Sequence, residues 1–188
     1  MTRRYVQRGG EGMYDDIRVE RDIMVPMRDG IKLACDIYRP ATAGQSVPGA
    51  FPVILERTPY GKGQTSRSES SRHHPERPQS RQEVAGFFVR HGYVVVYQDC
   101  RGRYGSEGVF EKYLSEATDG YDTCAWLVHQ SWCNGRIGTM GLSYAAHTQM
   151  ALASLNPPGL AAMFVDAGGF ANAGVPRKAG QVAVDRIL

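Results

Sequence analysis

One short stretch decides the fold of this sequence: Ile137-Gly138-Thr139-Met140-Gly141-Leu142-Ser143-Tyr144-Ala145-Ala146. It is typical of a strand that runs into a turn of small residues, with a serine at the apex and a helix directly afterwards. Such a turn, called a nucleophile elbow, needs small flanking residues because neighbouring backbone approaches closely, and it exposes the serine at the C-terminal edge of a sheet. The start of the helix also places backbone N–H groups beside any negative charge that develops there. The stretch therefore predicts a nucleophilic Ser143, although a serine that only caps the helix fits the same pattern.

Alternating strands and helices are predicted on both sides of this stretch. We expect strands at residues 23–27, 31–38, 51–56, 93–98, 136–141 and 161–167, the last of them buried, and helices at 83–91, 117–130 and 144–154, with Gly92 as the C-terminal stop of the first helix. The first two strands flank Asp29-Gly30, a dipeptide that favours an antiparallel hairpin. The strand–helix repeats that follow favour parallel strands. The predicted fold class is therefore α/β, with a mostly parallel sheet and an antiparallel N-terminal hairpin.

Two polar segments and a tail are expected to lie outside the packed core. Residues 1–22 are expected to form a flexible N-terminal arm. Apart from two prolines, residues 61–81 contain no hydrophobic residue, so they cannot bury enough surface to offset their ordering entropy and are expected to form a mobile loop. Residues 23–172 would then form the globular part, and residues 173–188 a basic, divergent tail.

Composition limits the classes of function without choosing among enzymes. The 188 residues are 42% hydrophobic and 22% charged, with a mean hydropathy of −0.37. These values exclude a membrane protein and a wholly disordered one, and no apolar run approaches the length of a membrane span. The net charge of +3 is too small to indicate a nucleic acid or another polyanionic partner.

The cysteines and the N-terminus bear on the cellular compartment. Cys35, Cys100, Cys124 and Cys133 lack the spacing of a metal site, so we expect buried, reduced thiols. Arg3-Arg4 is not followed by the apolar segment of an export signal. We therefore expect a cytoplasmic protein.

Several motifs occur in an order that resembles one family. They are Val25-Pro26-Met27-Arg28-Asp29-Gly30, Arg57-Thr58-Pro59-Tyr60, Gln98-Asp99-Cys100-Arg101-Gly102, Gly105-Ser106-Glu107-Gly108, the segment 119–127, Trp132-Cys133-Asn134-Gly135 and Gly141-Leu142-Ser143-Tyr144. Over residues 23–172 the chain resembles the N-terminal part of cocaine-esterase-like serine hydrolases, a group that includes Xaa-Pro dipeptidyl peptidases and α-amino-acid ester hydrolases. The resemblance implies an α/β-hydrolase sheet that is incomplete at its C-terminal side.

The resemblance also implies roles for three residues. Ser143 would be the acylated nucleophile, and the phenolic O–H of Tyr60 and the backbone N–H of Tyr144 would form the oxyanion hole. A core aromatic residue after a strand is the alternative interpretation of Tyr60. No metal ion or organic cofactor is implied.

Four charged residues near the predicted site have a structural interpretation. Asp99 and Arg101 are expected to brace the loop after the strand at 93–98. Asp119 and Asp122 are expected near a helix start, where a carboxylate interacts favourably with the helix dipole.

Two departures from the family pattern stand out. Ala146 occupies a position where related enzymes usually carry glycine. In this fold the acid and the histidine of the triad follow the serine, yet only 45 residues of the 188 follow Ser143, and His147 is the only histidine among them. His147 lies one helical turn onward, so its side chain is expected to run along the helix rather than over Ser143. We therefore expect a fragment that lacks the triad Asp and His and is nearly or wholly inactive alone.

Two other classes of function fit parts of the sequence. Gly102, Gly105 and Gly108 after a strand suggest an α/β module that binds a nucleotide, although their spacing is not that of a dinucleotide fingerprint. The missing histidine suggests an interaction protein that keeps the fold without the chemistry. The serine hydrolase accounts for more of the residues. Its partner would be a small-molecule or short-peptide acyl substrate with an ester, amide or Xaa-Pro bond, with no nucleic acid and no membrane, and the sequence leaves homo-oligomerisation open.

Overall fold

A mixed sheet organises the described part of the molecule. The computed structural model describes residues 13–65 and 78–167. They form a seven-stranded sheet in the order β1-β2-β5-β4-β6-β7, with β3 paired to β2. The strands are β1 (Asp16–Pro26), β2 (Lys32–Thr42), β3 (Gln45–Ser46), β4 (Phe51–Thr58), β5 (Val94–Asp99), β6 (Cys133–Leu142) and β7 (Leu160–Asp166). Strands β5, β4, β6 and β7 are parallel, whereas β2 is antiparallel to both of its neighbours, β1 and β5. This arrangement confirms the predicted fold class.

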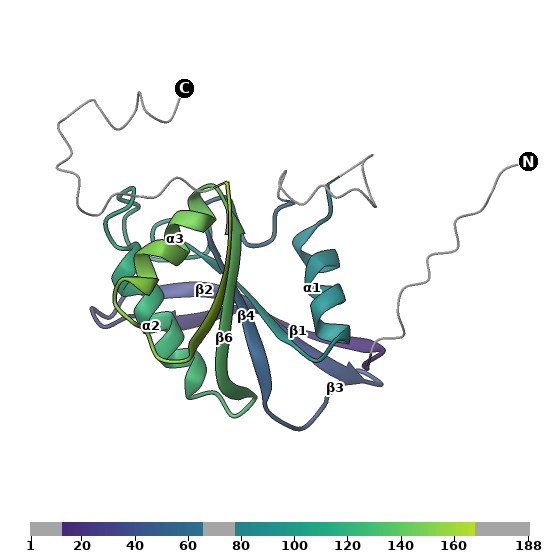
Figure 1. The fold of residues 1–188 in the computed structure, drawn as a ribbon. Coiled ribbons are helices and arrows are strands. Elements are labelled where there is room, and N and C mark those ends of the chain that lie inside the picture. The colour runs from purple at the N-terminus through teal and green to yellow at the C-terminus, as the bar shows by residue number, and fades with distance from the viewer. Residues whose placement is uncertain (1–12, 66–77, 168–188) are drawn as a thin grey trace, which may run out of the picture.

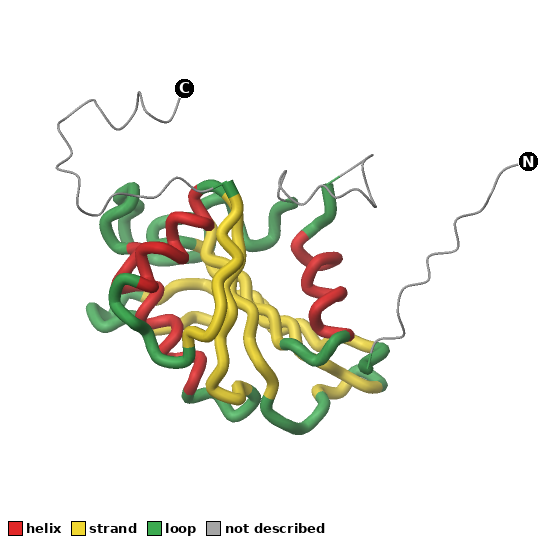
Figure 2. The backbone as a smooth tube through the Cα atoms, viewed as in Figure 1, coloured by secondary structure: helices red, strands yellow, loops and turns green. Residues whose placement is uncertain are grey.

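The helices cover both faces of the sheet. Figures 1 and 2 show α1 (Arg81–Arg90) on one side and α2 (Glu116–Val128) with α3 (Tyr144–Ala153) on the other. Side chains of β4 alternate between the two faces, as a strand requires. Val53 and Leu55 enter the apolar cluster that contains Leu127 of α2, whereas Ile54 packs on the cluster that contains Val89 of α1.

Local signals set the ends of α1. Ser80 and Glu83 form a capping box at its N-terminus, in which each side chain accepts a hydrogen bond from the other residue's backbone N–H. The helix ends at Arg90 with His91 as its C-cap residue, and Gly92 follows with a φ of +85°. This left-handed conformation favours glycine, which confirms the predicted C-terminal stop.

Two boundaries differ from the prediction. Strand β1 begins at Asp16, so residues 16–22 belong to the sheet and the boundary of the N-terminal arm at residue 22 is wrong. The polar loop is also shorter than expected, because Lys62 forms ion pairs with Asp22 and Asp36, and Arg81 is buried at the start of α1. Residues 66–77 of that loop and the tail at 173–188 lie outside the described residues.

Strand β7 is not buried, contrary to the prediction. It pairs with β6 and lies at the edge of the described sheet, and Phe164 is 70% exposed. All four cysteines are buried free thiols, as predicted. Within residues 13–65 and 78–167, no helix is long and apolar enough to cross a membrane.

Candidate active site

Ser143 lies at a strained turn between β6 and α3. Its backbone has a φ of +60° and a ψ of −116°, a region that a residue with a side chain rarely adopts. Its side chain makes no capping hydrogen bond, which contradicts the interpretation of Ser143 as a simple helix cap. A Cβ on Gly141 would lie 2.5 Å from the Cβ of Ala145, so the turn requires glycine there. Ala146 is completely buried at this turn, so the turn forms with alanine at that position.

Tyr60 is brought to Ser143 by the pairing of β4 with β6. The two strands are parallel neighbours, so their C-terminal ends meet at one edge of the sheet. Tyr60 follows β4, its side chain is 49% exposed, and its hydroxyl lies 3.5 Å from Oγ of Ser143. This exposure is at odds with the interpretation of Tyr60 as a core aromatic residue.

Tyr144 begins α3, and its backbone N–H therefore has no acceptor within the helix. Its ring is buried, and its hydroxyl donates to Oε1 of Glu116 at 2.9 Å while accepting from the backbone N–H of Tyr113 at 2.9 Å. Burial and the neighbouring Glu116 charge raise the pKa of Tyr144 far above its usual range. The phenol consequently stays protonated and fixes the first turn of α3.

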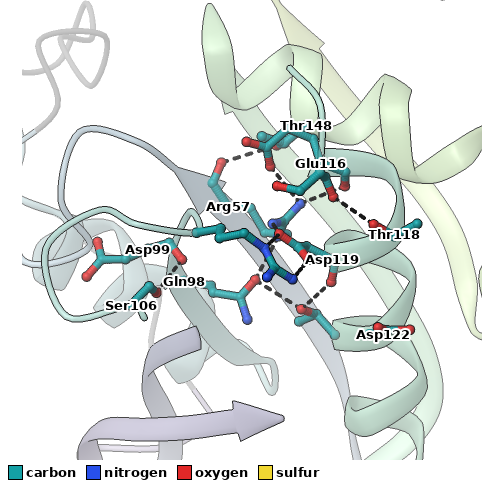
Figure 3. Close-up of polar contacts among 12 residues, drawn as sticks. Arg57, Gln98, Asp99, Ser106, Glu116, Thr118, Asp119, Asp122 and Thr148 are labelled. Atoms are coloured by element: carbon teal, nitrogen blue, oxygen red, sulfur yellow. Dashed lines mark hydrogen bonds and ion pairs between the residues drawn. The ribbon is translucent and has the colours of Figure 1, made fainter. Parts of the chain in front are cut away.

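Glu116, which accepts a hydrogen bond from the Tyr144 hydroxyl, belongs to a buried ion-pair network with Arg57. Figure 3 shows Arg57 and Glu116 with their neighbours Gln98 and Asp119. Nη1 of Arg57 lies 3.0 Å from Oε2 of Glu116 and donates to the backbone carbonyl of the same residue at 2.9 Å. Nε of Arg57 donates to Oε1 of Gln98 at 2.7 Å, and Asp119 lies 3.8 Å from Nη2. The Arg57 and Glu116 side chains are each only 1% exposed. This network joins β4, β5 and α2, and through Glu116 it reaches Tyr144 at the start of α3.

The loop after β5 is braced as predicted. The Asp99 carboxylate accepts hydrogen bonds from the backbone N–H of Lys62 at 2.7 Å and of Gly105 at 3.2 Å. Arg101 forms ion pairs with Asp119 at 2.6 Å and with Asp29 at 2.7 Å. A Cβ on Gly102 would lie 2.2 Å from the backbone nitrogen of Phe110. This glycine therefore allows the loop to close on itself, which accounts for it without a nucleotide.

The two aspartates of α2 differ in their environment. Asp119 lies in the first turn of the helix, as predicted, and also contributes to the buried network. Asp122 lies beyond the first turn, where it forms an ion pair at 2.7 Å with Arg28 of the hairpin turn. Its environment is therefore set by the hairpin rather than by the helix start.

The three predicted site residues share one pocket of about 420 Å³. Its lining consists of Pro59, Tyr60, Arg103, Phe110, Lys112, Tyr113, Ser143 and Tyr144, and so includes no histidine or carboxylate among the described residues. His147 is buried, with its ring centroid 4.3 Å from that of Tyr113. The other two described histidines, His91 and His129, lie at helix ends.

Sequence reasoning missed the wall of this pocket. Arg103, Phe110, Lys112 and Tyr113 all come from the segment between β5 and α2, which carries no periodic pattern. Only their position in the chain could have indicated them, because segments that follow parallel strands gather at the edge of the sheet where the elbow lies. Glu116 carries no motif, and its role depends on Arg57, which lies 59 residues earlier.

Comparisons with known proteins agree with the fold. The model of the X-Pro dipeptidyl-peptidase (S15) family matches residues 29–188, a range that includes the tail expected to diverge. A cocaine esterase from Rhodococcus sp. (strain MB1 Bresler) is 40% identical over 146 residues, which are 77% of this chain and 23% of the esterase. A CocE/NonD family hydrolase from Staphylococcus aureus has a TM-score of 0.63 at 39% identity, over 77% of this chain and 26% of that one. An α-amino acid ester hydrolase has a TM-score of 0.63 at 34% identity, over 89% and 27%. The chain thus spans about a quarter of the length of each of these relatives.

Proposed function

The chain belongs to the X-Pro dipeptidyl-peptidase (S15) family of hydrolases, and from this premise we propose that it carries the nucleophile and oxyanion hole of a serine hydrolase. One observation carries the proposal: the Tyr60 hydroxyl lies 3.5 Å from Oγ of Ser143, at a strained strand-to-helix turn. Strain at one residue is costly, and it persists at sites where geometry matters for function.

The proposed reaction is acyl transfer to Ser143. Its Oγ attacks the carbonyl carbon of an ester or amide, and a general base removes the hydroxyl proton. The oxyanion of the tetrahedral intermediate accepts hydrogen bonds from the Tyr60 hydroxyl and the Tyr144 backbone N–H. Collapse of the intermediate expels the alcohol or amine, and water then hydrolyses the acyl-enzyme. Glu116 and Arg57 take part indirectly, because they hold the Tyr144 ring and with it the start of α3.

The general base is proposed to come from outside this pocket. The pocket lining given above includes no histidine or carboxylate among the described residues, and His147 packs against Tyr113. Without its base, such a site still retains oxyanion stabilisation and substrate binding, which together give residual catalysis of about 10³–10⁴-fold over water. We therefore propose slow acylation and little turnover for this chain alone.

Labelling with a fluorophosphonate probe tests the proposal. We expect intact-mass analysis to detect one adduct per chain, absent in Ser143→Ala and retained in Ser154→Ala, which removes an exposed serine at the far end of α3. A folded chain that is never labelled, or labelled equally in both variants, would contradict the proposed nucleophile. It would favour an interaction protein that keeps the fold without the chemistry.

A further inference from the structure

The pocket around Ser143 contains two positive charges and no negative one among its described lining. Arg103 and Lys112 are these charges, and both belong to the segment between β5 and α2. The N-terminus of α3 adds the positive end of a helix dipole at Ser143. The nearby Glu116 carboxylate lies behind the wall, engaged by Arg57 and Tyr144.

Neither cation forms an ion pair within residues 13–65 and 78–167. Arg103 uses Nε to donate to the carbonyl of Pro59 at 3.1 Å, and its guanidinium carbon lies 5.2 Å from the centre of the Phe110 ring. Nζ of Lys112 lies 5.0 Å from the centre of the Tyr113 ring. Aromatic rings thus hold both cations in the pocket wall without neutralising their charge.

We propose that this pocket selects substrates that carry a carboxylate, an inference that rests on and deepens the proposed serine hydrolase. The terminal nitrogens of Arg103 make no hydrogen bond within the described part of the chain, and the planar guanidinium matches a carboxylate in two parallel bonds. Lys112 adds a second donor from the neighbouring wall. The aromatic rings of Phe110 and Tyr113 receive the apolar part of such a substrate. A substrate with an ammonium group meets repulsion from the same two residues.

Arylboronic acids test the preference without requiring turnover. Oγ of Ser143 adds to boron, which becomes tetrahedral and anionic as the hydroxyl proton passes to solvent. Three probes of similar size differ in charge: 4-carboxyphenylboronic acid, its neutral methyl ester and 4-(aminomethyl)phenylboronic acid. We expect calorimetric titration of the full chain to show about tenfold tighter binding of the carboxylate than of the methyl ester, and the weakest binding for the ammonium compound.

Matched variants assign the preference to its residues. Lys112→Gln and Arg103→Gln are each expected to reduce the preference about three- to tenfold, and Lys112→Arg to restore it. Arg136→Gln removes an exposed positive charge at the opposite end of β6 and is expected to leave the preference unchanged. Circular dichroism checks that each variant is folded.

The outcomes separate this inference from the proposed function. Equal binding of all three probes that is lost in Ser143→Ala overturns the charge preference and leaves the serine nucleophile supported. A carboxylate preference that depends on Lys112 and Arg103 but persists in Ser143→Ala supports the anion pocket and contradicts the nucleophile. If none of the three probes binds, both the anion pocket and the serine nucleophile are contradicted.

Discussion

Two neighbouring residues of β4, Glu56 and Arg57, form buried ion pairs on opposite faces of the sheet. Glu56 pairs at 2.6 Å with Arg81 at the start of α1, and Arg57 pairs at 3.0 Å with Glu116 at the start of α2. Each pair lies behind one of the two donors that the proposed oxyanion hole needs. Arg81 donates to the backbone carbonyls of Gly61 and Gln64, just after Tyr60, whereas Glu116 accepts from the Tyr144 hydroxyl.

The two pairs differ in how they could respond to the loss of their arginine. Burial raises the pKa of Glu56, and the Arg81 charge acts in the opposite direction. Glu56 can therefore take up a proton when its partner is removed. Arg57, by contrast, faces both Glu116 and Asp119 and also binds Gln98. Around Arg57, the Tyr144 side of the site thus has several charged and polar partners, whereas Glu56 on the Tyr60 side has one ionic partner, Arg81.

The largest effect is expected from breaking the network. Arg57→Met leaves Glu116 buried without its cationic partner, so we expect the free energy of unfolding to fall by about 3–5 kcal/mol. Urea denaturation followed by circular dichroism measures this change. Arg136→Met, an exposed position on β6, serves as the control and should change stability by less than about 0.5 kcal/mol. A loss below about 1 kcal/mol for Arg57→Met would mean that the network is not what holds this side together.

Tyr60→Phe separates chemistry from stability. It removes one proposed oxyanion donor, so we expect fluorophosphonate labelling of Ser143 to slow by about 10²–10³, equivalent to about 2.7–4 kcal/mol. Stability should not change, because Tyr60 is half exposed and its hydroxyl forms a hydrogen bond only with Ser143 within the described residues. Tyr93→Phe changes another partly exposed tyrosine, beyond α1, and should leave the labelling rate unchanged. Equal rates for Tyr60→Phe and the unaltered chain would remove Tyr60 from the oxyanion hole.

Breaking the ion pair between Glu56 and Arg81 should lower the free energy of unfolding by less, and the loss should depend on pH. Arg81→Met is expected to lower the free energy of unfolding by about 2 kcal/mol at pH 7.5, because Glu56 remains buried without a partner. A carboxyl whose folded-state pKa is raised contributes stability that is present below its unfolded pKa and lost as the pH rises through the folded pKa. The penalty of Arg81→Met should therefore shrink between pH 7.5 and pH 5. Urea midpoints at the two pH values test this, and a penalty that grows on acidification would contradict it.

Features that depend on residues close together in the chain could be predicted from the sequence, whereas features that depend on distant segments could not. The elbow around Ser143, the hairpin at Asp29-Gly30 and the stop at Gly92 depend on residues close together in the chain, and all three were predicted correctly. The start of β1 was missed because residues 16–22 are rich in charge, and an edge strand needs only one apolar face. The burial of β7 was predicted from its apolar composition, but burial also depends on a neighbour beyond the strand itself.

The candidate site was predictable only in part, for the same reason. Ser143, Tyr60 and Tyr144 belong to motifs that resemble a family, and the structure brings them together in one pocket. Their catalytic roles stay predictions until labelling tests them. The pairing of Arg57 with Glu116 and the gathering of Arg103 and Lys112 at the pocket wall depend on how distant segments fold together. No local pattern in those segments signals such contacts.

The smallest effect is expected from an ion pair at the surface, between Arg28 of the hairpin turn and Asp122 of α2. Partial burial acts against ionisation of Asp122, but hydrogen bonds from Arg28 outweigh it and lower the pKa of Asp122. Asp122→Asn removes the charge and keeps an oxygen that can accept from the Arg28 backbone N–H, so we expect the Tm to fall by only about 1–3 °C. A lowered folded-state pKa contributes stability that is present above the unfolded pKa, about 3.9, and lost as the pH falls through the folded pKa. The difference in Tm between the two proteins should therefore be constant from pH 7 to pH 5 and disappear in more acidic solution. Calorimetric scans across this range test the expectation. A fall in Tm as large as the one that Arg57→Met causes would contradict it, because a surface pair would then stabilise the fold as much as the buried network.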